Sequence, residues 1–195
     1  MIAVQPTQLL SPSQYEALRP LLRPLFIAEK ERRRLELGSH LTLLFENTQT
    51  AWYQIQEMIR SERIVAFDAL AHELETYNEL LPGPSQLSAT LLIQFPDPLL
   101  RDEQLRRLVG LERHLWLIEG ERRELAQFDA RQMTEERISS VHFVKFSLDG
   151  LNADRFLGRA RQGRLAIEVD HPHLSARAAI SGTLALALAS DLEQA

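Results

Sequence analysis

The hydrophobic periodicity of the chain changes about halfway along its length, and this change most constrains the fold. Between residues 11 and 81, apolar side chains recur mainly at the three- and four-residue spacing of α-helices. The short apolar run at 40–47 is an exception and predicts a strand. From about residue 85 onwards, short apolar or alternating runs favour strands, mixed with shorter helical segments. Helices followed by a mixture of strands and helices indicate an α+β fold with a largely antiparallel sheet.

The boundaries of these elements follow from capping and turn residues. The expected helices cover 11–37, 48–64, 66–81, 102–110, 152–163 and 180–194. The further expected strands cover 87–95, 113–119, 122–129, 139–148 and 164–171. Pro20 and Pro24 predict that the first helix is kinked or divided in two. Gly120 and Glu121 predict a hairpin turn between the strands on either side of them.

The chain has the length of one domain. It contains 195 residues, of which 45% are hydrophobic and 25% charged, enough to bury a sizeable core. No repeat, linker or low-complexity segment divides it. We therefore predict a single compact α+β domain over residues 1–195, in which N-terminal helices pack on a largely antiparallel mixed sheet. The helical part is expected at about 11–81 and the sheet-rich part at about 85–195.

The sequence contains no cysteine. This excludes disulfides, thiol nucleophiles and any iron–sulfur cluster held by the chain's own cysteines. A metal cofactor would need His, Asp, Glu or backbone oxygen ligands, and zinc or non-haem iron are the candidates.

The net charge of −5 argues against a nucleic-acid partner. The first residues lack the features of a signal peptide, and the apolar run at 184–189 is too short to span a bilayer, so we expect a cytoplasmic protein with no membrane association.

The segment QIQEMIRSERI (residues 54–64) carries the first group of candidate functional residues. Glu57 and Glu62 are the acid–base candidates, and Arg60 and Arg63 are the candidates for binding a cofactor or ligand. Glu62 is notable because it continues the apolar stripe of the helix. The alternative is a solvated helix face, in which Glu57 pairs with Arg60 and Glu62 lies in solvent at the helix end.

Three histidines form the second group of candidates. His171 and His173 are two residues apart and share one face of an extended chain. His142 is expected to point inward from the strand at 139–148. If this strand and the one at 164–171 are neighbours, the three imidazoles together suit zinc or non-haem iron with an open coordination position. The alternative is three structural histidines, each with its own hydrogen-bond partner.

Searches for established catalytic motifs give nothing. The sequence has no Walker loop, no glycine-rich dinucleotide fingerprint, no G-x-S-x-G elbow and no H-E-x-x-H. The residues alone therefore leave open whether the protein is an enzyme.

Five segments, in this order, resemble the bacterial domain-of-unknown-function family 3501 (DUF3501). They are RRRLELGSHLTLLFEN, YQIQEMIRSERI, YNELLPGPSQLSATLLIQF, VHFVKF and VDHPH, and the similarity extends over roughly residues 13 to 192. The resemblance implies a link to redox or peroxide handling, because such proteins are often encoded beside rubrerythrin-like proteins and iron–sulfur oxidoreductases. It also implies an aromatic residue where this chain has His173, which weakens the three-histidine hypothesis. It supplies no catalytic residue.

Three hypotheses follow. The leading one is a non-catalytic accessory or binding component of a cytoplasmic redox or peroxide-stress system, with a rubrerythrin-like protein and an iron–sulfur oxidoreductase as the partners implied by the resemblance. The second is a small metalloenzyme with zinc or non-haem iron held by His142 and His171, and with Glu57 or Glu62 as the acid–base group. The third is a homo-oligomeric, dimeric structural or interaction protein.

Overall fold

Two antiparallel sheets face one another in a computed structural model of the chain, which describes residues 1–129, 131 and 136–193. The first sheet has the strand order β1 (Arg34–Leu37), β2 (Leu41–Phe45), β3 (Gln86–Ile93), β7 (Val141–Ser147) and β6 (Gln127–Phe128). The second has the order β5 (Arg122–Leu125), β4 (Leu115–Glu119), β8 (Leu165–His171) and β9 (Leu174–Ala179). Close contacts between β1 and β9, and between β5 and β7, bring the two sheets together.

The main core fills the space between the sheets. Alternation along the strands directs one set of side chains inward, such as Leu43 of β2, Leu91 of β3 and Ile167 of β8. Three helices close the ends of this core: α5 (Ala153–Arg161) and α6 (Gly182–Glu193) at one end, and α4 (Pro98–Arg107) at the other. Phe156 of α5, Leu188 of α6 and Leu105 of α4 are each buried within it.

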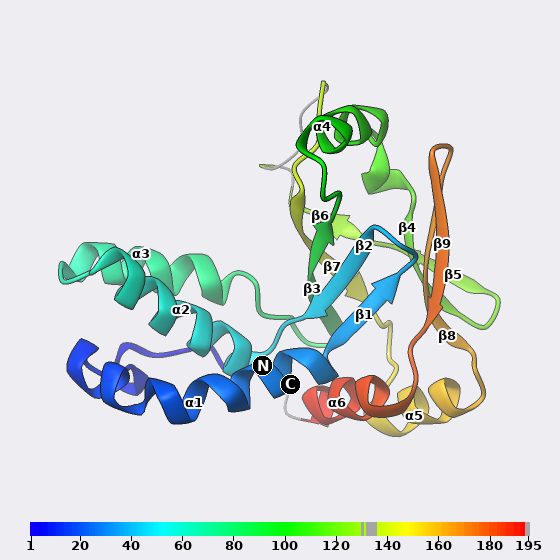
Figure 1. Cartoon of the computed structure of the whole chain (residues 1–195). Helices are drawn as coiled ribbons and strands as arrows, with labels where there is room; N and C mark the ends of the chain where they lie inside the picture. Colours follow the sequence, from blue (N-terminus) through cyan, green and yellow to red (C-terminus); the bar gives the residue numbers. More distant parts are fainter. Residues whose placement is uncertain (130, 132–135, 194–195) are drawn as a thin grey trace.

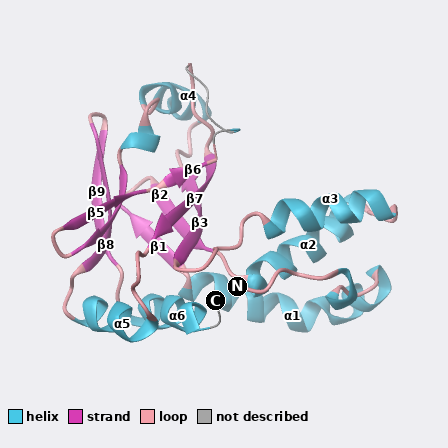
Figure 2. Cartoon of the chain, turned by 180° about the vertical axis from the view of Figure 1, so that it is seen from behind, coloured by secondary structure: helices cyan, strands magenta, loops and turns pink. Residues whose placement is uncertain are grey.

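The first three helices form an arm that extends to one side of the sheets, as Figures 1 and 2 show from opposite directions. The arm consists of α1 (Pro12–Arg32), α2 (Thr48–Glu62) and α3 (Phe67–Asn78). It has a small core of its own, made by residues such as Ile55 and Ile59 of α2 and Leu74 of α3. Ser11 and Asn47 begin α1 and α2 with capping boxes, which satisfy free backbone N–H groups at the helix starts.

The α+β class and the antiparallel pairing are confirmed, including the predicted hairpin of β4 and β5. The strands are divided between two sheets, because β4, β5, β8 and β9 pair only with one another in the part of the chain that the structure describes. The first helix is one element of 21 residues with Pro20 and Pro24 inside it, and it ends at Arg32 rather than at residue 37. Contacts with α2 on both sides of the prolines hold it together: Tyr15 binds Glu57, and Phe26 stacks on Tyr53 at 4.6 Å.

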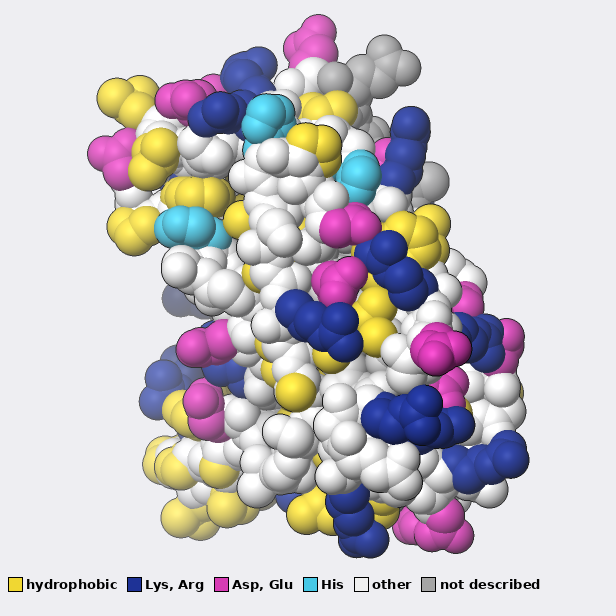
Figure 3. Space-filling model, turned by 90° about the vertical axis from the view of Figure 1, so that its right-hand side faces the viewer, with side chains coloured by type: hydrophobic (Ala, Val, Ile, Leu, Met, Phe, Trp, Pro, Cys, Tyr) yellow, Lys and Arg dark blue, Asp and Glu magenta, His cyan; other side chains and the backbone are white. Residues whose placement is uncertain are grey.

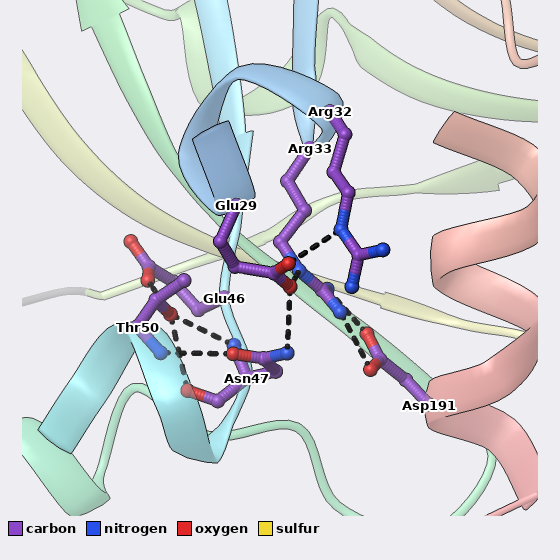
Figure 4. A network of polar contacts seen from close by, with 7 residues as sticks. All are labelled: Glu29, Arg32, Arg33, Glu46, Asn47, Thr50 and Asp191. Carbon is purple, nitrogen blue, oxygen red and sulfur yellow. Dashed lines mark hydrogen bonds and ion pairs between the residues drawn. The ribbon is translucent and has the colours of Figure 1, made fainter. Parts of the chain in front are cut away.

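A buried ionic network joins the arm to the sheets and to α6 (Figure 4). Arg33, which is 2% exposed, donates from Nη2 to Asp191 Oδ1 of α6 at 2.8 Å and also donates to Glu29 of α1. Burial alone would lower the pKa of Arg33, but Asp191 and Glu29 raise it, so the guanidinium is charged. Asn47 Nδ2 donates to Glu29 at 3.4 Å, and Asn47 Oδ1 caps α2 through the Thr50 backbone N–H at 2.9 Å. One arginine therefore connects α1, β1, α6 and, through Glu29, the start of α2.

Removing Asp191 should destabilise the protein strongly, because it leaves a buried guanidinium without one of its two carboxylates. We expect Asp191→Ala to lower the free energy of unfolding by about 3 kcal/mol or more. Glu103→Ala, which removes the exposed partner of Arg107 on α4, is the control and should change it by less than about 1 kcal/mol. Urea unfolding at pH 7 measures both changes, and equal effects would show that the buried network has no special role.

Candidate functional site

A groove lies where the arm meets the outer face of the first sheet. It consists of two adjoining hollows of about 240 Å³ and 490 Å³, which share Leu80 and Phe143 as lining residues. Its floor is formed by side chains of β2, β3 and β7, namely Leu44, Ser88, Thr90, Val141, Phe143 and Lys145. Its wall is formed by Ala51 and Gln54 of α2, Tyr77 of α3 and Leu80. Figure 1 shows the corner at which the arm meets the first sheet.

Strand alternation explains why apolar side chains lie on this floor. Val144 and Phe146 of β7 point into the core and are fully buried, so Val141, Phe143 and Lys145 point to the opposite face. The outer face of an antiparallel sheet is ordinarily polar. Here Val141 is 36% exposed and Phe143 is half-buried, and both line the smaller hollow.

The charged residues of the groove differ in their surroundings. Lys30 Nζ donates to Gln54 Oε1 at 3.2 Å and lies 5.5 Å from the centre of the Tyr53 ring. The ammonium group of Lys145 has no hydrogen bond or ion pair to any residue that the structure describes. Glu46 accepts hydrogen bonds from the hydroxyls of Thr50 and Thr90, the latter at 2.7 Å. The groove thus has an apolar centre with one ammonium group in each hollow.

Glu57 lies in the interface of α1 and α2 and not in the groove. Its Oε1 accepts from the Tyr15 hydroxyl at 2.6 Å and from Arg19 Nε at 2.7 Å. These bonds, led by that of Arg19, lower the pKa of Glu57 to about 2. The predicted Glu57–Arg60 pair is wrong, because α1 supplies a partner to each residue: Arg60 Nε donates to Glu16 at 2.7 Å.

Glu62 and Arg63 mark the end of α2. Glu62 is exposed, which agrees with its expected place in solvent at the helix end. Arg63 has a φ of 54°, and this left-handed conformation ends the helix. Neither residue lines the groove with the residues named above. The acid–base role of Glu57 and Glu62 and the binding role of Arg60 and Arg63 stay predictions.

His142 points inward from β7, as predicted, and is 1% exposed. Its Nε2 lies 2.9 Å from the carbonyl oxygen of Ser139, and burial lowers its pKa. The condition for the three-histidine site, that the strands of His142 and His171 are neighbours, is not met, because β7 pairs with β3 and β6 whereas β8 pairs with β4 and β9. His142 therefore enters the core from the opposite sheet.

His171 and His173 lie close together, as their spacing predicts, with ring centres 5.7 Å apart. Both ring nitrogens of His171 are already in use: Nε2 lies 3.2 Å from the Val109 carbonyl oxygen, and Nδ1 accepts from the His173 backbone N–H at 3.3 Å. Among residues 1–129, 131 and 136–193, no group of three His, Asp or Glu side chains is arranged to hold a metal ion. The metalloenzyme hypothesis stays a prediction, and metal analysis of protein purified without an affinity tag tests it.

The outer face of the second sheet carries an ionic network centred on Asp170. Its Oδ2 accepts from Arg123 at 2.6 Å, and its Oδ1 accepts from Trp116 Nε1 at 3.0 Å and lies 3.0 Å from His114 Nδ1. The bond from Arg123 is the main cause that lowers the pKa of Asp170 to about 2. Figure 3 shows basic and acidic side chains interleaved over this face. These groups satisfy one another, so we assign the network to holding β4, β5 and β8 together.

Comparison with known proteins places the chain in a family. The model of the family described as "Protein of unknown function (DUF3501)" matches residues 3–192. The chain belongs to the DUF3501 family. The resemblance found in the sequence is thereby confirmed.

A solved structure supports the same DUF3501 fold. It is the crystal structure of a protein of unknown function from Burkholderia pseudomallei, 36% identical in sequence, with a TM-score of 0.86. The alignment covers 98% of this chain and 100% of that one. No match is found among curated proteins. In the described part of this DUF3501 chain, no helix combines the length and the apolar character needed to cross a bilayer.

The lowered pKa of Glu57 makes its contribution to stability depend on pH. Because the folded-state pKa is about 2 against an ordinary 4.5, the contribution is fully present above pH 4.5 and is lost as the pH falls toward 2. We expect Glu57→Gln to lower the free energy of unfolding at pH 7 by about 2 kcal/mol, allowing for partial exposure. Below the ordinary carboxyl pKa, the difference from wild type should shrink.

Urea unfolding at a series of pH values measures this difference. Glu62→Gln, at the exposed end of the same helix, is the matched control and should change stability by less than about 0.5 kcal/mol at every pH. A Glu57→Gln effect of constant size from neutral to acid pH would contradict the assignment.

Proposed function

We propose that this DUF3501 protein is a non-catalytic binding component of a cytoplasmic redox or peroxide-handling system, and that the groove receives a segment of its partner protein. The observation that supports this is the apolar floor of the groove. Apolar side chains on a solvent-facing surface, framed by polar ones, are typical of interaction sites. Val141, Phe143 and Leu44 form such a surface on the outer face of the sheet.

The shape of the groove favours a polypeptide segment over a small molecule. Ligand sites for small molecules are concave and bury most of the ligand surface. The two hollows of about 240 Å³ and 490 Å³ instead run into one another across β3 and β7. A polypeptide in extended or helical form can follow such a path, with side chains entering successive hollows.

The redox assignment rests on the family resemblance and on cysteine usage. The resemblance implies a rubrerythrin-like protein and an iron–sulfur oxidoreductase as partners. The chain has no cysteine with which to hold an iron–sulfur cluster. In the proposed system the partner carries the redox centre, and this protein supplies a docking surface.

A charge on the floor of the smaller hollow should prevent docking. We expect Val141→Asp to weaken the binding of a purified rubrerythrin-like protein or iron–sulfur oxidoreductase from the same genome by at least about tenfold, because the partner must desolvate the new carboxylate. Val65→Asp is the matched control, since Val65 is 92% exposed and lies outside the groove. Isothermal titration calorimetry measures the affinities, and circular dichroism checks that both variants are folded.

Two results would count against the proposal in different ways. If neither redox protein binds the wild-type chain, the assignment of the partner is wrong. If one binds and both variants retain its full affinity, the groove is not the docking site.

A further inference from the structure

The two lysines of the chain both lie in the groove. Of the 22 basic residues, 20 are arginines, and Lys30 and Lys145 are the only lysines in the sequence. Lys30 comes from α1 and lines the smaller hollow, whereas Lys145 comes from β7 and lines the larger one. Positions so far apart in the sequence meet at one surface. All other basic residues are arginines, and of these Arg131 also lines the larger hollow, where it pairs with Glu79 and Asp129.

Neither ammonium group has a carboxylate partner in the described structure. Lys30 donates to an uncharged amide, Gln54 Oε1, and the ammonium group of Lys145 has no hydrogen bond or ion pair within residues 1–129, 131 and 136–193. Both side chains are half-buried. The acidic residues of the groove are already engaged: Glu46 binds two threonine hydroxyls, and Glu79 and Asp129 both pair with Arg131.

The chemistry of lysine indicates what these groups can bind. An ammonium is a compact point charge on a flexible stem, whereas a guanidinium is a rigid planar fork. A half-buried ammonium has lost part of its hydration and gains from an incoming carboxylate that replaces the water. Charges placed in this way at an interface contribute to the choice of partner and to the rate of association.

We propose that the groove recognises an acidic, apolar polypeptide segment, in which apolar side chains contact Leu80 and Phe143 and one carboxylate on each side pairs with Lys30 or Lys145. This inference rests on the proposed function, because it assigns the chemistry of the segment that docks there. The shared residues Leu80 and Phe143 mark the point where the two hollows meet, and each lysine belongs to one hollow. The order acidic, apolar, acidic therefore follows the order of groups along the groove.

Amine-specific labelling tests the inference directly, because the intact chain offers only two lysine amines and the N-terminal amine. The probes are the peptide acetyl-Glu-Leu-Phe-Glu-amide and its counterpart with both Glu replaced by Gln, at millimolar concentration. We expect the Glu peptide to slow reductive methylation of both lysines several-fold and the Gln peptide to leave their rates unchanged. The N-terminal amine is the internal reference, and mass spectrometry follows each site.

Affinity measurements with the redox partner provide a second test of the inference. We expect the double variant Lys30→Gln, Lys145→Gln to bind the partner at least tenfold more weakly and with a smaller dependence on salt. Arg161→Gln is the control, because Arg161 is an exposed basic residue on α5 outside the groove.

The outcomes separate this inference from the proposed function. If Val141→Asp abolishes partner binding while the lysine variant binds normally and the lysines stay fully reactive, the inference is overturned and the proposed function stands. If no redox partner binds but the Glu peptide alone protects both lysines, the inference is supported and the proposed partner is wrong. Equal protection by the two peptides, or protection by neither the peptides nor the partner, overturns the inference.

Discussion

The arrangement of the molecule depends on one buried guanidinium. Arg33 lies where α1 passes into β1, and its two carboxylate partners come from α1 and from α6 near the end of the chain. Removing one partner of a buried ion pair is strongly destabilising, because the remaining charge has left water without compensation. The pair therefore fixes the direction in which the arm leaves the sheets. Without that direction there is no corner between arm and sheet, and so no groove.

The same junction extends into the wall of the groove. Asn47, which contacts Glu29, begins α2, and its neighbour Glu46 binds hydroxyls of Thr50 on α2 and Thr90 on β3. The short segment after β2, Glu46 and Asn47, therefore has three roles. It caps α2, attaches the arm and shapes the smaller hollow. A change within this segment would alter folding and binding together. Val141 and Lys145, farther along β7, allow binding to be tested with less effect on the junction.

Local patterns predict the local structure well and the long-range pairing poorly. Periodicity identified most helices and strands and hence the α+β class, because each depends on neighbouring residues. Periodicity did not predict two strands. β1 follows directly on a charged helix end, and β9 (LSARAA) alternates mainly small residues. The division into two sheets was also missed, since it depends on which strands pair across the whole chain. The junction of Arg33 with Asp191 spans 158 positions and leaves no periodic trace.

The candidate site shows the same limit at the level of single residues. The charge-rich helix α2 was identified, but the partners of Glu57 lie 42 and 38 positions away on α1. The sequence spacing predicted that His171 lies beside His173, but it carries no information on the sheet to which His142 belongs. The groove itself combines residues from α1, the end of α3 and β7, so no motif describes it. One signal was present throughout, the use of 20 arginines against two lysines. It acquires a physical meaning only when both ammonium groups are placed in one groove without a carboxylate partner among the described residues.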